Sequence, residues 1–90
     1  MTRVPKPKRV ELEGEYYHVR FRDPGDFSEI RTPKWARGVA RDVVDGSKVR
    51  TGRRSGSDEW VVQSVLVPED EGERRARSAA QRIVEKIEGE

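Results

Sequence analysis

The sequence predicts a small α+β domain, in which a mostly antiparallel sheet of three or four strands carries two helices on one face. Short segments alternate apolar and polar residues with the two-residue period of β-strands. Two longer segments place apolar residues at helical spacing, and turn residues separate all of these segments. The predicted order is β-(β)-α-β-β-α, which lacks the regular strand–helix alternation of a parallel sheet. The strand in parentheses has the weakest pattern.

Length and composition are consistent with one ionic domain. The chain has 90 residues, which suits a single domain. Charged residues make up 40% of it, against about 25% in average domains. The net charge is only +2 and the apolar residues are periodic, so we expect a folded chain with a small core.

Residues 1–14 are expected to form a flexible N-terminal arm before a single domain over 15–90. The stretch MTRVPKPKR combines two prolines with four basic residues, and ELEGE adds three carboxylates. Neither stretch shows a clear period. A basic arm can contact an anionic partner, and the other interpretation is a frayed terminus.

The first strand is predicted over 16–22, where YYHVRFR alternates. The side chains expected to face the core are those of Tyr17, Val19 and Phe21. Those expected on the opposite face are Tyr16, His18, Arg20 and Arg22. The sequence DPGD at 23–26 then predicts a turn. A short strand over 27–31 is expected to follow and to close a hairpin with the first.

The first helix is predicted to begin at Thr32 and Pro33. Threonine favours the N-cap, and proline favours the first helical position. Apolar residues then recur at helical spacing: Trp35, Val39 and Val43, with Ala36 and Ala40 beside them. We therefore expect Trp35 in the core. Asp45-Gly46 predicts the helix end.

Two strands are predicted next, over 48–54 and 59–67. The second, EWVVQSVLV, is apolar on both faces and is therefore expected inside the sheet. The predicted faces are Trp60, Val62 and Leu66 on one side and Val61, Val65 and Val67 on the other. With both helices on one side, about half of these residues would be exposed. Such a patch indicates an interface, for instance in a homodimer. Coverage by the arm or by a helix is the alternative.

The last helix has the strongest period in the sequence. Pro68 ends the preceding strand, and Asp70 with Glu73 has the spacing of a capping box. The apolar positions that follow are Ala76, Ala79, Ala80, Ile83, Val84 and Ile87. We expect this stripe to pack on the sheet.

The residue inventory argues against several functional classes. The absence of cysteine excludes disulfides, zinc thiolates and cysteine nucleophiles. His18 is the one histidine, and no serine or glycine lies in a nucleophile or phosphate-binding motif. We therefore expect no enzyme, metal or cofactor. No apolar run approaches the roughly 20 residues of a membrane span, and the cytoplasm is the expected compartment.

Basic residues beside aromatic rings form the candidate binding site. In KVRTGRR, alternation places Lys48, Arg50 and Arg54 on one face. If Val49 faces the core, these cations share the open sheet face with the outward residues of the first strand. Cations that meet phosphates beside rings that stack on bases are typical of single-stranded nucleic-acid binding. The predicted site comprises Tyr16, His18, Arg20, Arg22, Lys48, Arg50 and Arg54.

Two interpretations of function follow from these patterns. The first is a small non-enzymatic protein that binds DNA or RNA through this basic face and its N-terminal arm. The alternative is a protein-interaction or homodimeric structural module that binds no nucleic acid.

Overall fold

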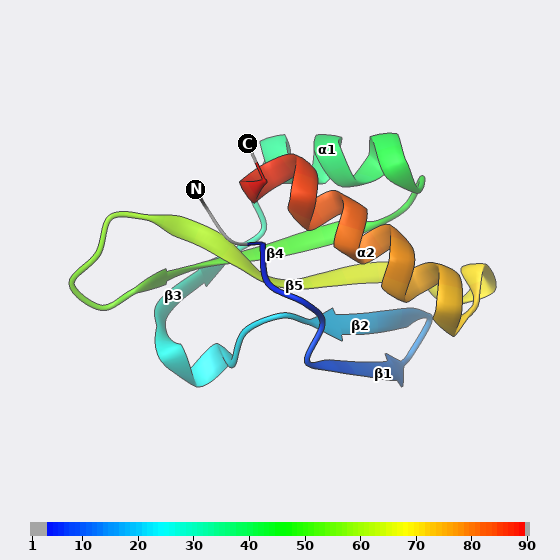
Figure 1. Cartoon of the computed structure of the whole chain (residues 1–90), viewed down its shortest axis with the longest axis horizontal. Coiled ribbons are helices and arrows are strands. Elements are labelled where there is room, and N and C mark those ends of the chain that lie inside the picture. Colours follow the sequence, from blue (N-terminus) through cyan, green and yellow to red (C-terminus); the bar gives the residue numbers. More distant parts are fainter. Residues whose placement is uncertain (1–3, 90) are drawn as a thin grey trace.

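The computed structural model describes residues 4–89 and shows an α+β fold, with both helices on one face of an antiparallel sheet (Figure 1). The elements are β1 (Arg9–Glu13), β2 (Tyr16–Arg20), β3 (Phe27–Arg31), α1 (Lys34–Val43), β4 (Lys48–Arg54), β5 (Trp60–Pro68) and α2 (Glu73–Glu88). The strand order across the sheet is β1-β2-β5-β4-β3. The predicted fold class is confirmed, but the sheet has five strands rather than three or four.

The additional strand, β1, lies within the segment predicted to be an arm. Arg9–Glu13 pairs antiparallel with β2, and Glu13 lies opposite Tyr16. Gly14 takes a φ of 62° at the first position of the two-residue loop, as in type II′ hairpin turns. The alternation of RVELE carried this signal, but it followed a proline-rich stretch that has no period. Residues 1–3 of the predicted arm lie outside the described part of the chain.

Strand β3 has the predicted bounds but a different partner. It pairs with β4 at the far edge of the sheet and not with β2. The turn before it is a 3-10 helix over Pro24–Asp26, in which the Asp23 carboxylate accepts a hydrogen bond from the Gly25 N–H at 2.9 Å. The free edge of β2 pairs instead with β5, where valines lie opposite Tyr17 and Val19. Apolar pairing with a distant strand therefore prevails over the local hairpin.

A β-bulge divides the central strand β5 into two parts. Arg50 lies opposite Ser64, but the next residue, Thr51, lies opposite Val62, so Gln63 is an extra residue. One extra residue reverses the facing of all side chains beyond it. Val62, Val65 and Val67 therefore lie on the face of the sheet that packs against the helices (the helix face), while Ser64 and Leu66 lie on the opposite, open face. The prediction that Val62 and Leu66 share a face is wrong for this reason.

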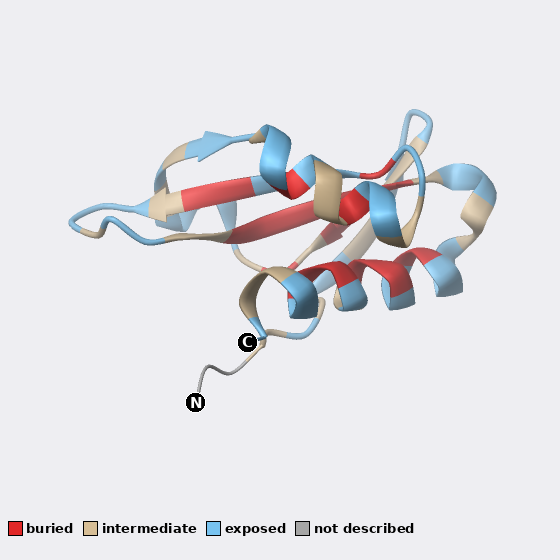
Figure 2. Cartoon of the chain, turned by 90° about the horizontal axis from the view of Figure 1, so that it is seen from above, coloured by how far each residue is buried: buried red, intermediate tan, exposed pale blue. Residues whose placement is uncertain are grey.

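The core lies between the sheet and the two helices. Helix α2 contributes the predicted stripe, and its buried residues are Ala76, Ala79, Ala80, Ile83 and Val84. Figure 2 shows this helix buried along one side and exposed along the other. Helix α1 buries only Ala36 and Ala40, while Trp35 is 56% exposed. The prediction that Trp35 belongs to the core is wrong, because the two alanines occupy the centre of the helix contact.

Both helices begin later than their sequence signals predict. Helix α1 begins after Pro33, which takes the N-cap position, so Thr32 caps nothing. Asp70 lies in a 3-10 turn over Glu69–Glu71, and α2 begins after Gly72, whose φ is 83°. Neither start has a side-chain cap. Packing of the apolar stripes therefore accounts for these helices better than capping does.

Residues of the neighbouring strands, and not helices, flank the other face of β5, which is nevertheless buried. Leu66 is only 7% exposed and lies between His18 and Lys48 on the neighbouring strands. Ser64 is 2% exposed and lies between Arg20 and Arg50 in the same way. Long side chains of this type cover apolar surface with their stems and keep their charges in water. The expected bare patch is absent, so the homodimer interpretation loses the feature on which it was based.

Arg22 was expected on the open face but turns toward α2. Its guanidinium makes two 3.0 Å hydrogen bonds to the Glu88 carboxylate and a third, at 2.8 Å, to the Val62 carbonyl. Glu88 also accepts the Val62 N–H at 2.6 Å. The Gln63 carbonyl accepts the N–H groups of Phe21 and Arg22. The bulge thus ends the regular alternation of β2 and ties its end to the C-terminus of α2.

Removing the Glu88 carboxylate is expected to destabilise the fold strongly. Glu88→Ala leaves the Arg22 charge and the Val62 N–H without their partners in a part-buried site. We expect a loss of about 3–5 kcal/mol in the free energy of unfolding, measured by urea denaturation. Glu85→Ala is the matched control on the exposed side of the same helix, where the change should stay within about 0.5 kcal/mol. Equal losses in the two variants would contradict the structural role of the Glu88 pair.

Candidate nucleic-acid interface

Six of the seven predicted site residues lie on the open face of the sheet. Cross-strand pairs share a face, and the pairings run from β2 across β5 to β4. Strand β2 presents Tyr16, His18 and Arg20, and strand β4 presents Lys48, Arg50 and Arg54. Val49 is buried on the helix face, as the alternation of β4 requires. The seventh residue, Arg22, lies against Glu88 and is not part of this face.

Carboxylates of β1 neutralise Arg20. The guanidinium lies 3.0 Å from Glu11 and 3.4 Å from Glu13, and these residues alternate along the same face. Arg9 also lies 3.7 Å from Glu11. Sequence reasoning missed this pairing because it assigned these carboxylates to an arm. The β1–β2 side of the face is therefore close to neutral.

Strand β4 is the positive side of the face. Within the described residues, Lys48, Arg50 and Arg54 form no ion pair. The Lys48 ammonium lies 5.2 Å from the centroid of the Tyr16 ring, and the Arg54 guanidinium lies 5.9 Å from that of Phe27. The ends of the β4 row are therefore cation–π pairs, and Arg50 lies between them.

Phe27 is an aromatic member of the face that the sequence did not single out. A Cβ atom built at Gly52 would lie 2.5 Å from the Phe27 ring, so the ring rests directly on the backbone of β4. Gly52 is buried although it faces the open side. A glycine in the middle of a strand is the signal of such a close approach.

The basic surface continues from β4 onto α1. A pocket of about 250 Å³ is lined by Tyr16, Arg37, Arg41, Asp45, Gly46, Ser47 and Lys48. Three cations, one carboxylate and one aromatic ring therefore surround this hollow. Lys48 joins the pocket to the open face, so a ligand that follows β4 would reach the arginines of α1.

The basic residues of the N-terminal segment lie beside the end of β2. A pocket of about 360 Å³ is lined by Lys8, Arg9, Arg20, Arg22, Asp23 and Pro24. The Lys8 N–H donates to the Arg20 carbonyl at 2.8 Å, which holds the segment in place. Carboxylates already pair with three of the four cations here, so the unpaired charge of β4 is more accessible to a ligand.

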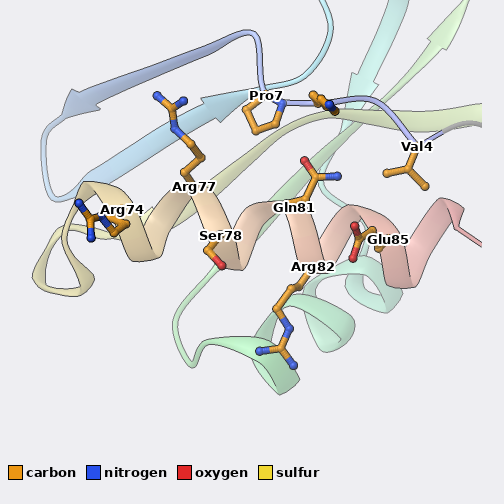
Figure 3. A pocket seen from close by; sticks show the side chains of 9 residues that line it. Val4, Pro7, Arg74, Arg77, Ser78, Gln81, Arg82 and Glu85 are labelled. Atoms are coloured by element: carbon orange, nitrogen blue, oxygen red, sulfur yellow. The ribbon is translucent and has the colours of Figure 1, made fainter.

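A second basic surface follows α2 on the helix side of the molecule. A groove of about 820 Å³ runs between this helix and the N-terminal segment, and the Gln81 amide donates to the Pro5 carbonyl at 3.2 Å across it. Figure 3 shows Arg77 and Gln81 on the side of α2 that faces the N-terminal segment, and Arg82 directed toward α1. The lining residues are Val4, Lys6, Pro7, Arg74, Arg77, Ser78, Gln81, Arg82 and Glu85. No aromatic ring lies among them, unlike the surface of β4.

Comparison with known proteins adds no relatives: no family model matches the chain, and neither curated proteins nor solved structures give a significant match. Neither helix of the described chain is long and apolar enough to span a membrane. Within residues 4–89, no group of three potential metal ligands converges.

The contact between Gly52 and Phe27 yields a stability test. Gly52→Ala is expected to cost about 1–3 kcal/mol, because the new methyl group must displace the ring. In a Phe27→Ala background this cost should fall by at least about 1 kcal/mol. Denaturant unfolding of the two single variants and the double variant measures the coupling.

Gly38→Ala provides the control for added methyl groups. Nothing lies within 4 Å of a Cβ atom at this position in α1. The substitution should therefore stabilise the fold by about 1 kcal/mol through helix propensity. If Gly52→Ala lowers the free energy of unfolding equally with and without the Phe27 ring, then a clash with that ring is not the cause of the loss.

Proposed function

We propose that the open sheet face binds single-stranded nucleic acid along β4. The observation that supports this best is the row of unpaired cations, Lys48, Arg50 and Arg54, with Tyr16 and Phe27 at its two ends. Phosphates bind such cations, while bases stack on rings and on guanidinium planes. The proposed role is binding, without a reaction.

Single strands fit this face better than a duplex. A duplex presents its base edges in grooves, which are read by a protruding helix or a two-stranded ribbon. Here the cations and rings lie on the open face of a sheet. Bases must be unpaired to stack on such a platform.

The charge distribution suggests a path for the strand. Glu11 and Glu13 occupy the β1 side of the face and would repel phosphates, whereas β4 carries only cations. From Lys48 to Arg54 the row extends about 20 Å, at about 3.4 Å per residue. Beyond Lys48, the path continues to Arg37 and Arg41 of α1.

Removing two cations of β4 should weaken binding and reduce its salt dependence. Each exposed contact contributes up to about 1 kcal/mol, so Arg50→Ala/Arg54→Ala should lower affinity about tenfold at about 50 mM salt. The slope of log K against log salt should flatten by about 1.4, at about 0.7 per phosphate contact on a single strand. Fluorescence anisotropy with labelled DNA and RNA oligonucleotides of about 12 nucleotides measures both quantities.

The matched control removes the same charge from the opposite side of the molecule. Arg74→Ala/Arg77→Ala lowers the net charge equally but changes the groove along α2. Affinity should then fall far less, because only long-range attraction is lost. Absence of oligonucleotide binding at about 50 mM salt would overturn the proposal. A greater loss in the α2 variant would place the site on the helix side.

A further inference from the structure

Both tryptophans of the chain meet in one small pocket at the β3 edge of the sheet. The pocket has a volume of about 230 Å³ and is lined by Arg31, Pro33, Trp35, Thr51 and Trp60. Residues from β3, β4, β5 and the start of α1 therefore converge here. Thr51 is buried, and its hydroxyl donates to the Arg31 carbonyl at 3.3 Å.

Trp35 is poorly explained by folding alone. It is 56% exposed, although burial of a large aromatic side chain is a major source of stability. Other outward positions of α1 carry Arg37 and Arg41. Tryptophan is among the residues most enriched in binding hot spots. Trp35 is therefore better placed to contact a ligand than to stabilise the core.

The charges around the pocket restrict the class of ligand. The Arg31 guanidinium lies 5.5 Å from the centroid of the Trp60 ring. Arg31 and Arg53 both pair with the single carboxylate of Glu29, which leaves an excess of positive charge. A cationic ligand would meet repulsion and a ring that already contacts a cation. A flat ring attached to an anionic group matches this environment.

We propose that the pocket binds one nucleobase of a single strand, stacked on Trp35, with the adjoining phosphate near Arg31. This inference rests on the proposed function and adds a base-binding site to it. The last two residues of β4 provide the connection, because Arg54 faces the open side and Arg53 faces the helix side. A strand that follows β4 past Arg54 therefore meets cations on both sides of the sheet at this edge.

Intrinsic fluorescence tests the proposal directly, because the chain has two tryptophans and both line the pocket. Titration with an unlabelled oligonucleotide of about 12 nucleotides should quench the emission. Trp35→Ala should lower affinity about tenfold, the lower range for loss of one base stack. Trp35→Phe retains an aromatic ring and should restore most of the affinity. Thermal melting should show that both variants remain folded, since the side chain is exposed.

The outcomes separate this proposal from the one for the sheet face. The pocket proposal alone would be overturned if Arg50→Ala/Arg54→Ala weakens oligonucleotide binding, while binding does not quench the tryptophan emission and Trp35→Ala does not change the affinity. The sheet-face site alone would be overturned by a different result. In that case the oligonucleotide quenches the emission of the unaltered protein and Trp35→Ala loses affinity, but Arg50→Ala/Arg54→Ala binds with unchanged affinity. Failure of any oligonucleotide to bind would overturn both. Quenching by a proline-rich peptide but not by an oligonucleotide would assign the pocket to peptide recognition.

Discussion

The central constraint on this molecule is that its most apolar strand, β5, must be shielded on both faces, although residues 4–89 form only two α-helices. Both helices pack on one side (Figure 1), so the second side has no helical layer. On that side Leu66 is nevertheless only 7% exposed, with His18 of β2 and Lys48 of β4 beside it. A residue such as lysine or arginine covers apolar surface with its stem at little cost, because its charge stays in water. The high content of charged residues is therefore compatible with a stable fold and contributes to its second layer.

The bulge at Gln63 accounts for several features of the fold. The extra residue reverses the alternation of side chains along β5, so valines face the helices both before and after the bulge. At the same point the Gln63 carbonyl accepts two N–H groups from the end of β2. Arg22 is thereby directed toward α2, where Glu88 pairs with it and also accepts the Val62 N–H. One extra residue thus sets the facing of the central strand, the end of its neighbour and the anchoring of the last helix.

Lys48 and Arg50 flank β5 and also belong to the row of cations proposed to bind nucleic acid. Their stems cover the strand while their charged groups remain available, so folding and ligand binding place compatible demands on the same side chains. Strand β1 makes the charge of the open face asymmetric. Glu11 and Glu13 neutralise Arg20 on the β1 side, whereas the cations that β4 presents on this face have no carboxylate partner among residues 4–89. The proposed path of a strand follows from this asymmetry. It ends at the β3 edge, where the exposed Trp35 and the half-buried Trp60 share a hollow.

Sequence patterns were enough to predict the class of the fold, the bounds of β3 and β4, the core stripe of α2 and the common face of Lys48, Arg50 and Arg54. Each of these depends on local periodicity, which neighbouring residues fix through backbone geometry. Four contacts could be learned only from the folded structure: β3 pairs with β4, Arg22 meets Glu88, Phe27 rests on Gly52 and the two tryptophans converge. These contacts join residues far apart in the chain, and the choice among competing partners depends on which apolar surfaces pack together. A single bulged residue also reverses the facing of a strand, and no local pattern in EWVVQSVLV reveals its position.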